Sequence, residues 1–254
     1  MKTSSLEKIV AILDKPLRAE AYSDSSHNGL QVANSGKVSR VACGVDASLE
    51  FFQAARRQGA DLCIVHHGMS WGDSLARLTG AKYDLVKFLM QNDMALYASH
   101  IPLDAHPTLG NNALLAKALG LQKLVRFGRY HGAVISFQGS LAKAMGRDEF
   151  RERIGRVTGN AVTALPFGAA RIRTVALISG GGAEWMEAAA NAGMDAFVTG
   201  EIGLCAYNIA KQAKLNAFAA GHYATETLGV KALGALLQKR CGIPAEFIDL
   251  KIAF

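Results

Sequence analysis

Cys63-Ile64-Val65-His66-His67-Gly68 is the stretch that decides the fold. Its apolar part has the length and composition of a buried strand, and the histidines and glycine mark the point where that strand stops at a sheet edge. We predict that both imidazoles project from the turn that follows. Adjacent side chains on extended backbone point to opposite faces, so the pair can serve two metal ions, or one ion only if the turn folds the rings together. This geometry favours a two-metal site.

The segments around this strand predict a parallel sheet. A strand over residues 40–45 and an amphipathic helix over 47–58 come before it. Strand, helix and strand in this order imply two parallel strands joined by a crossover helix. A helix over 81–92 and a strand over 94–98 continue the alternation, and this strand leads into His100. The carboxyl ends of such strands are the places where open α/β sheets bind ligands.

A repeat relates the second half of the chain to the first. Identical residues recur 134 positions apart, namely Val41 and Val175, Gly59 and Gly193, and Asp61 and Asp195. The same offset places Gly200-Glu201 opposite His66-His67. With a gap allowed, His100 and Asp104 align with His222 and Glu226. Chance similarity is the alternative, because two strand–helix–strand units share composition. The coincidence of two His-x-x-x-carboxylate segments favours an internal duplication.

The fold class that follows is α/β, with two similar α/β lobes and the metal site in the cleft between them. The character of the sequence changes near residue 125, and we place the boundary between the two lobes there. Residues 1–125 form the first lobe and residues 126–254 the second, with the C-terminal helix free to pack back on the first lobe. The histidine motifs divide between the lobes, with His66, His67, His100 and Asp104 in the first and His222 and Glu226 in the second.

The bulk composition is that of a globular protein, because half of the 254 residues are hydrophobic and 19% are charged. The net charge of +7 suits nucleic acid, nucleotides or acidic metabolites, but no clustered basic run occurs, so a solvated basic surface is the simpler interpretation. The four cysteines lie far apart, which argues against a disulfide framework. No uncharged apolar run reaches the ~18–20 residues that span a bilayer. We therefore expect a cytoplasmic protein without membrane contact.

The histidines and carboxylates are candidate metal ligands. An imidazole-rich set with carboxylates suits Zn, Fe, Mn, Co or Ni and suits Ca or Mg poorly. Pro102 argues against a helix between His100 and Asp104, so we predict a loop that curls both groups towards one point. Glu226 is predicted in the first turn of a helix over residues 225–239, where the helix dipole favours an anion that bridges two cations. Two ions ~3.5–4 Å apart activate a water for hydrolysis near neutral pH.

A triple glycine and two isolated histidines stand apart from these motifs. Gly180-Gly181-Gly182 follows a strand and precedes a helix, so its backbone N–H groups could hold a phosphate. It matches neither a P-loop nor a dinucleotide fingerprint, so a tight turn is the simpler interpretation. His27 and His131 match no motif and are predicted to be exposed or structural.

The motifs together carry a family resemblance that runs from about residue 22 to about residue 250. The segments concerned are Asn28-Gly29-Leu30-Gln31-Val32, Val65-His66-His67-Gly68, His100-Ile101-Pro102-Leu103-Asp104-Ala105-His106-Pro107, Thr199-Gly200-Glu201 and Gly221-His222-Tyr223-Ala224-Thr225-Glu226. In this order they resemble the Nif-three-like dinuclear-metal family, whose members commonly carry the name GTP cyclohydrolase I type 2 homolog. The chain is similar to the short form, because it has no room for the extra middle domain of longer members.

The resemblance implies two divalent ions, and the ligands that it implies by position are His66, His67, Asp104, His222 and Glu226. Glu226 would bridge the ions. His100 would lie beside the site as a ligand or proton shuttle, and Glu201 and His106 would support the ligands. The resemblance also implies a homo-hexameric ring whose sites face an inner cavity.

Two functions follow from this resemblance. The first is a metal-dependent hydrolase that acts on a nucleotide or a related phosphorylated heterocycle, with His100 or Glu201 moving the proton. The alternative is a non-catalytic metal-binding ring that binds nucleic acid or a protein partner, which the basic charge and the lack of a separate nucleophile motivate. In a third interpretation, the histidines are core or solvated residues and no metal binds.

Overall fold

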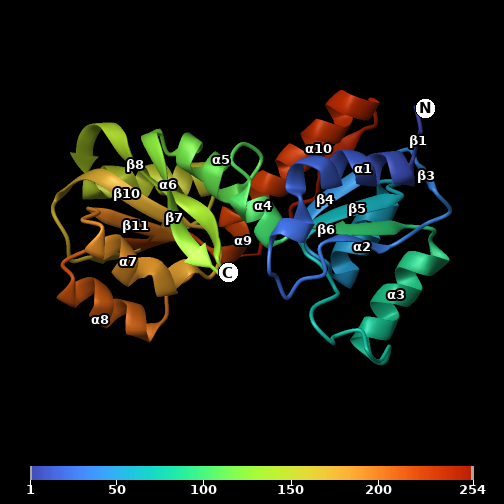
Figure 1. Ribbon diagram of the computed structural model, residues 1–254, viewed down its shortest axis with the longest axis horizontal. Coiled ribbons are helices and arrows are strands. Elements are labelled where there is room, and N and C mark those ends of the chain that lie inside the picture. The colour runs from blue at the N-terminus through green and yellow to red at the C-terminus, as the bar shows by residue number, and fades with distance from the viewer. Residues whose placement is uncertain (1, 253–254) are drawn as a thin grey trace. The chain divides into compact units, whose positions relative to one another are not determined.

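Parallel strands separated by amphipathic helices organise both parts of the computed structural model, which describes residues 2–252 (Figure 1). The chain forms two compact units. Unit 1 contains the residues up to Leu103 together with Gly229–Lys251, and unit 2 contains Asp104–Leu228. The predicted lobes, residues 1–125 and 126–254, stay a prediction. They were drawn from the character of the sequence, whereas the two units are defined by contacts between residues.

Unit 1 is built on a five-stranded sheet with the strand order β13-β4-β5-β6-β2. Its strands are β2 (Gly29–Val32), β4 (Val41–Asp46), β5 (Leu62–His67), β6 (Ala95–Ala98) and β13 (Ala245–Phe247). The four strands β13, β4, β5 and β6 run parallel, and only β2 is antiparallel to its neighbour. A short ribbon of β1 (Ser4–Ser5) and β3 (Lys37–Val38) lies apart from this sheet.

Helices cover both faces of the unit 1 sheet, which explains why its central strands are continuously apolar (Figure 1). On one face, α2 (Leu49–Arg57) and α3 (Ala81–Gln91) bury side chains that include Phe52 and Leu89. On the other face lie α1 (Leu6–Leu17) and the part of α10 (Thr227–Cys241) that belongs to unit 1. The short η1 (Ala19–Ala21) follows α1 in the chain. Each fully buried aromatic side chain contributes about 1.5–3 kcal/mol by leaving water.

Unit 2 is built on a six-stranded sheet with the strand order β7-β8-β10-β11-β12-β9. Its strands are β7 (Leu121–Tyr130), β8 (Ala133–Gly146), β9 (Thr163–Pro166), β10 (Arg171–Ile178), β11 (Ala196–Thr199) and β12 (Asn216–Ala219). The central strands β10, β11 and β12 run parallel, and the flanking pairs are antiparallel.

The helices of unit 2 also cover both faces of its sheet. α5 (Asn111–Ala118) and α6 (Arg147–Thr158) bury Leu115, Phe150 and Ile154 against one face. The remaining elements are η2 (Gly182–Trp185), α7 (Met186–Asn191), α8 (Leu204–Gln212) and α9 (His222–Thr225). Among the described residues, no helix combines the length and the apolar character that crossing a bilayer requires.

The mixed α/β class with strands and helices in the predicted order is confirmed, but three local predictions are wrong. β5 runs through His67, so both imidazoles come from the strand itself. Pro102 lies inside the short helix α4 (Ile101–Ala105), where its missing N–H is not needed because the first turn has no intrahelical acceptor. Glu226 lies between α9 and α10, so the predicted helix over 225–239 is broken at that residue.

Candidate metal centre

The carboxyl ends of β4, β5 and β6 bring three histidines of unit 1 together. The imidazole centroids of His66 and His67 lie 4.7 Å apart, and His100 lies 5.1 Å from the first ring and 5.6 Å from the second. One ring nitrogen of each histidine lies within 4.8 Å of the others. His66 is fully buried and the other two are half-buried. The histidines that the sequence places at these strand ends therefore lie together within unit 1.

An oxygen acceptor holds the Nδ1 atom of each of these rings. The Nδ1–H of His66 donates to the Ser99 carbonyl oxygen at 2.8 Å, and that of His67 donates to Asp46 Oδ1 at 2.8 Å. The third ring, His100, donates to Asp24 Oδ1 at 3.0 Å. Carbonyl and carboxylate oxygens only accept, so Nδ1 carries the proton and Nε2 carries the lone pair that a metal ion needs. Such partners fix the tautomer and orientation of metal-ligating histidines.

Asp24 anchors His100 from the polar loop that precedes β2. Burial alone would raise the pKa of this carboxyl group, but the hydrogen bond and charge of His100, together with donors from Asn28 and Ser26, lower the pKa to about 2. Asp24 also accepts the backbone N–H of Ile101, and Asn28 Oδ1 accepts that of His100 at 2.7 Å. The loop thus fixes both the ring and the backbone of His100.

Trp71 forms an aromatic wall beside the imidazoles. Its ring lies 4.9 Å from the His100 ring and 6.1 Å from the His67 ring, and its indole N–H donates to the Gly68 carbonyl oxygen. Gly68 has to be glycine, because a Cβ there would lie 2.6 Å from the Ala98 Cβ and would overlap the Gln31 amide. The glycine that ends the opening motif therefore allows close packing next to the histidines.

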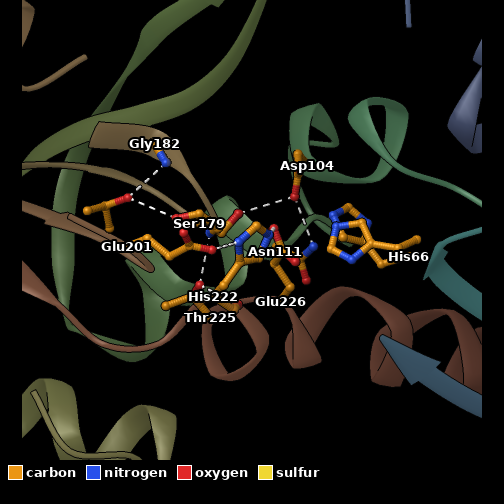
Figure 2. Close-up of polar contacts among 12 residues, drawn as sticks. His66, Asp104, Asn111, Ser179, Gly182, Glu201, His222, Thr225 and Glu226 are labelled. Atoms are coloured by element: carbon orange, nitrogen blue, oxygen red, sulfur yellow. Dashed lines mark hydrogen bonds and ion pairs between the residues drawn. The ribbon is translucent and has the colours of Figure 1, made fainter. Parts of the chain in front are cut away.

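In unit 2, the carboxyl ends of β10, β11 and β12 collect carboxylates around one histidine. His222 donates from Nδ1 to Glu201, and its Nε2 lies 3.3 Å from Glu226 Oε1 (Figure 2). Burial lowers the pKa of His222, but the hydrogen bonds and charges of Glu226 and Glu201 outweigh burial and raise the pKa to about 9. Without a metal ion, the ring is therefore an imidazolium held between two carboxylates at neutral pH.

Asp104 and Glu226 are buried carboxylates of unit 2, with 6% and 3% of their surfaces exposed. Asp104 Oδ1 accepts from Asn111 Nδ2 at 2.9 Å and from Ser179 Oγ at 3.2 Å (Figure 2). A Cβ at Gly180, the next residue, would overlap Glu226 Oε1. Buried carboxylates carry a large desolvation cost unless hydrogen bonds or cations compensate for it. Their burial next to a histidine is what a cation site needs.

The triple glycine is a tight turn, as the simpler interpretation of the sequence predicted. The Gly180 N–H donates to Thr225 Oγ1 at 3.0 Å and the Gly182 N–H donates to Thr199 Oγ1 at 3.0 Å. A phosphate bound here would have to replace both hydrogen bonds. The structure therefore does not support a phosphate site at the triple glycine.

Two other histidines have structural roles that their contacts define. His106 Nδ1 accepts the backbone N–H groups of Thr108 and Leu109, and burial lowers the pKa of this ring, which suits a neutral acceptor. His27 Nδ1 is 2.6 Å from Ser70 Oγ in the loop next to β2. His131 is exposed at the turn between β7 and β8.

Sequence reasoning missed the residues that orient the candidate ligands, which are Asp46 and Asp24 for the histidines and Asn111 and Ser179 for Asp104. Asp46 ends β4 at the same sheet edge as His67, so its position in the strand pattern could have identified it. No local signal marks Asp24, Asn111 or Ser179, because their partners lie elsewhere in the chain.

The donors fit a divalent metal ion. Each motif histidine presents Nε2, and both buried carboxylates offer oxygen atoms, which is a ligand set for borderline first-row ions. These buried histidines and carboxylates could thus hold metal.

Comparison with known proteins gives matches along nearly the whole chain. A family model described as Duf34/NIF3 (NGG1p interacting factor 3) matches residues 4–252. A protein of Archaeoglobus fulgidus named "GTP cyclohydrolase 1 type 2 homolog" is 40% identical over 246 residues, which cover 97% of this chain and 98% of the relative. A protein of the same name from Deinococcus radiodurans is 42% identical over 243 residues, covering 96% and 92%.

Solved structures match equally well. A protein called ybgI, described as of unknown function, superposes with a TM-score of 0.91 at 34% identity and covers 99% of this chain and 100% of its own. A protein from Thermus thermophilus gives the same TM-score, identity and coverage. HcgD from Methanocaldococcus jannaschii, at 22% identity and a TM-score of 0.86, shares the fold.

Proposed function

Because the chain belongs to the Duf34/NIF3 family, as its motifs suggested, we propose that it is a metal-dependent hydrolase with a dinuclear divalent site. Its substrate is a nucleotide or a related phosphorylated heterocycle. The relatives' printed name, GTP cyclohydrolase 1 type 2 homolog, supports a purine nucleotide as the first substrate to test. The observation that carries the proposal is the orientation of four motif histidines by oxygen acceptors at their Nδ1 atoms.

The proposed ligands are His66, His67, Asp104, His222 and Glu226, and the proposed metals are Zn, Fe, Mn, Co or Ni. A pair of such ions supplies Lewis acidity and activates water for hydrolysis near neutral pH. Glu226 is the proposed bridge, because its carboxylate is buried and offers two oxygen atoms. The orientation of Asp104 is set by Asn111 and Ser179.

The proposed proton carriers are His100 and Glu201. His100 holds its Nδ1 proton against the ionised Asp24, so a proton gained at Nε2 is stabilised by the charge behind the ring. Glu201 lies against His222 Nδ1, and 38% of its side chain is exposed, whereas only 4% of the Glu226 side chain is. That exposure lets Glu201 exchange protons with solvent while it orients the ring.

A substrate screen tests the proposal. Nucleotides, pterin precursors and phosphate esters would be offered to the metal-loaded protein, with product formation followed by chromatography. We expect Glu226→Ala and His67→Ala to lower turnover by ~100-fold or more, because each removes a metal ligand. The matched control is Glu152→Ala, whose side chain is 72% exposed on α6. Unchanged turnover in both ligand variants would overturn the assignment.

A non-catalytic role is the second candidate, and the net charge of +7 is the observation that favours it. In this role a homo-hexameric ring with bound metal holds nucleic acid or a protein partner. Light scattering measures the oligomeric state, and a monomer in solution would contradict the ring. A DNA affinity that falls steeply with salt would support nucleic-acid binding, whereas a salt-independent affinity would count against it.

A further inference from the structure

We propose that the loop after β5, residues 71–82 of unit 1, is the subsite that holds a nucleotide. Trp71 stacks on the base, and Arg77 and Lys82 bind the phosphates. This inference rests on the proposed function for the choice of a nucleotide. It adds the place where the nucleotide binds, the residues that hold it and the direction in which it lies.

A phosphorylated substrate needs N–H donors or cations, and the triple glycine does not provide them. The N–H groups of Gly180 and Gly182 already donate to threonine hydroxyls. In unit 1, Arg40 pairs with Glu246 at 2.9 Å and precedes β4, so it lies at the sheet edge opposite to the histidines. The loop that leaves the carboxyl end of β5 is therefore the place to look for cations.

An open pocket of about 560 Å³ lies in this loop, and its polar lining residues are Asp73, Ser74, Arg77, Thr79 and Lys82. The lining carries two cations against one carboxylate. Arg77 and Lys82 are exposed, so their charged groups can turn to a ligand without breaking a buried contact. Guanidinium and ammonium groups are the cations with which proteins bind phosphate. The volume lies within the ~300–1,000 Å³ of small-molecule sites.

Ser74 connects this pocket to the histidines. Its Oγ accepts the Trp71 backbone N–H at 2.8 Å, and its own N–H donates to the Trp71 carbonyl oxygen at 2.8 Å. Lys82 Nζ donates to the Ser74 carbonyl oxygen. Three residues of chain span at most about 11 Å, so Trp71 and the pocket are close enough for one nucleotide to contact both.

Trp71 is suited to bind the base. Its indole N–H donates to the Gly68 carbonyl oxygen, and its side chain is only half-buried, so the ring is held in place with part of it open to solvent. Its ring lies 4.9 Å from the His100 ring. The base would therefore lie towards the candidate metal centre and the phosphates away from it. A hydrolase that opens a heterocycle needs this direction, because the ring is the part that reacts.

Binding of GTP, guanosine and inorganic triphosphate to the full chain as purified tests the proposal, with affinities measured by calorimetry. We expect Arg77→Ala and Lys82→Ala each to weaken GTP and triphosphate by about tenfold and to leave guanosine unchanged, because each removes a charge-assisted hydrogen bond. Trp71→Leu should weaken GTP and guanosine by about tenfold. Lys87→Ala is the matched control, since Lys87 is an exposed cation of α3 that lies over the Tyr83 ring.

Two further measurements do not depend on removing a large side chain. Asp73→Asn should strengthen triphosphate binding by about threefold, because one negative charge leaves the pocket. Unchanged or weaker binding in this variant would contradict a phosphate in the pocket. The chain has two tryptophans, so Trp185→Phe isolates the emission of Trp71. Guanosine should quench that emission, and an emission that guanosine does not change would contradict stacking on Trp71.

The outcomes separate this inference from the proposed function. If the wild type does not bind GTP, or if Arg77→Ala and Lys82→Ala bind it as tightly as Lys87→Ala does, the loop subsite is wrong. Turnover found in the substrate screen would then leave the hydrolase standing. If GTP binds through the loop but the screen finds no turnover, the subsite stands and the hydrolase function fails.

Discussion

Unit 1 and unit 2 place their polar side chains at the same edge of a similar parallel core, but one collects imidazoles and the other collects carboxylates. β4, β5 and β6 end in Asp46, His67 and the segment that leads to His100. β10, β11 and β12 end next to Ser179, Glu201 and His222. The comparison shows that the sheet edge sets the place of a site, whereas single residues at that edge set its chemistry.

The two cores agree in detail at an offset of 134 residues. Val41 pairs with Leu62, and Val175 pairs with Ala196. The Asp61 carboxylate accepts the backbone N–H groups of Ser39 and Arg40, and the Asp195 carboxylate accepts those of Arg173 and Thr174. Gly59 and Gly193 both end a helix with positive φ, at 76° and 69°. The internal duplication stays a prediction, and these matching strand pairs, hydrogen bonds and helix ends support it.

The difference between the units has a steric cause. Unit 2 has Gly200 where unit 1 has His66. A Cβ at Gly200 would lie 2.6 Å from the Gly180 carbonyl oxygen and 2.7 Å from the His222 Cα. The close turn at Gly180, which makes room for Glu226, thus excludes a histidine at position 200. One unit cannot have both the glycine turn that seats Glu226 and the histidine pair.

Thiol labelling should show the largest contrast between the units. Cys43 and Cys63 are buried in the unit 1 sheet, and burial raises the pKa of the Cys43 thiol to about 12, whereas Cys205 is exposed on α8. We expect Cys205 to react with a disulfide reagent ~1,000-fold faster than the two buried thiols, which react only when unit 1 opens. Mass spectrometry after timed quenching measures each rate, with Cys205→Ser as control. Equal rates would show that unit 1 opens readily.

Removing the matching carboxylates should destabilise both units to a similar extent. Asp61→Ala and Asp195→Ala each leave strand N–H groups without their acceptor, so we expect each to lower the free energy of unfolding by about 1–3 kcal/mol. Urea titration followed by circular dichroism measures both values. Asp84→Ala, at an exposed position on α3, should change stability by less than about 0.5 kcal/mol. A large loss of unfolding free energy in only one of the two variants would show that the two carboxylates are not equivalent.

Asp46→Asn should weaken metal binding at the histidines without removing a ligand. The amide no longer fixes the Nδ1–H of His67 with a full charge, so we expect a loss of Zn²⁺ affinity of about 10–100-fold, or about 1.4–2.7 kcal/mol. Competition with a chromophoric chelator measures the affinity. Glu50→Gln on the exposed side of α2 is the control. Wild-type affinity in Asp46→Asn would mean that this carboxylate does not orient the ligand.

In the metal-free protein, the free energy of unfolding should fall at alkaline pH because of His222 in unit 2 and at acid pH because of Asp24 in unit 1. The pKa of His222 is raised to about 9, so its stabilising effect is complete below its unfolded pKa and is lost as pH rises towards 9. The pKa of Asp24 is lowered to about 2, so its effect is present above the unfolded pKa and is lost as pH falls from about 4 to 2. We expect each limb to amount to about 1–2 kcal/mol.

Urea unfolding after chelator treatment, repeated between about pH 2 and pH 10, measures both limbs. His222→Ala should flatten the alkaline limb and Asp24→Asn the acid limb. An alkaline limb that survives in His222→Ala would assign it to other groups.

Local patterns in the sequence account for much of the fold and for part of the site. The periodicity over residues 81–92 predicted α3 to within one residue of its observed end, and the apolar run before His66 predicted β5. The prediction failed at Pro102, because a proline in the first turn of a helix costs little. It also failed at Glu226, which lies between α9 and α10 and close to Gly180 of a distant turn. Such breaks depend on distant neighbours, which a local pattern does not contain.

The sequence by itself determined the α/β class, the parallel order of the central strands and the placement of histidines at their carboxyl ends. These features depend on hydrophobic periodicity and on residues adjacent in the chain. Only the tertiary structure decided which nitrogen of each histidine is held by an oxygen acceptor. That choice depends on hydrogen bonds such as the one from His100 to Asp24, 76 residues away, and packing alone brings such partners together.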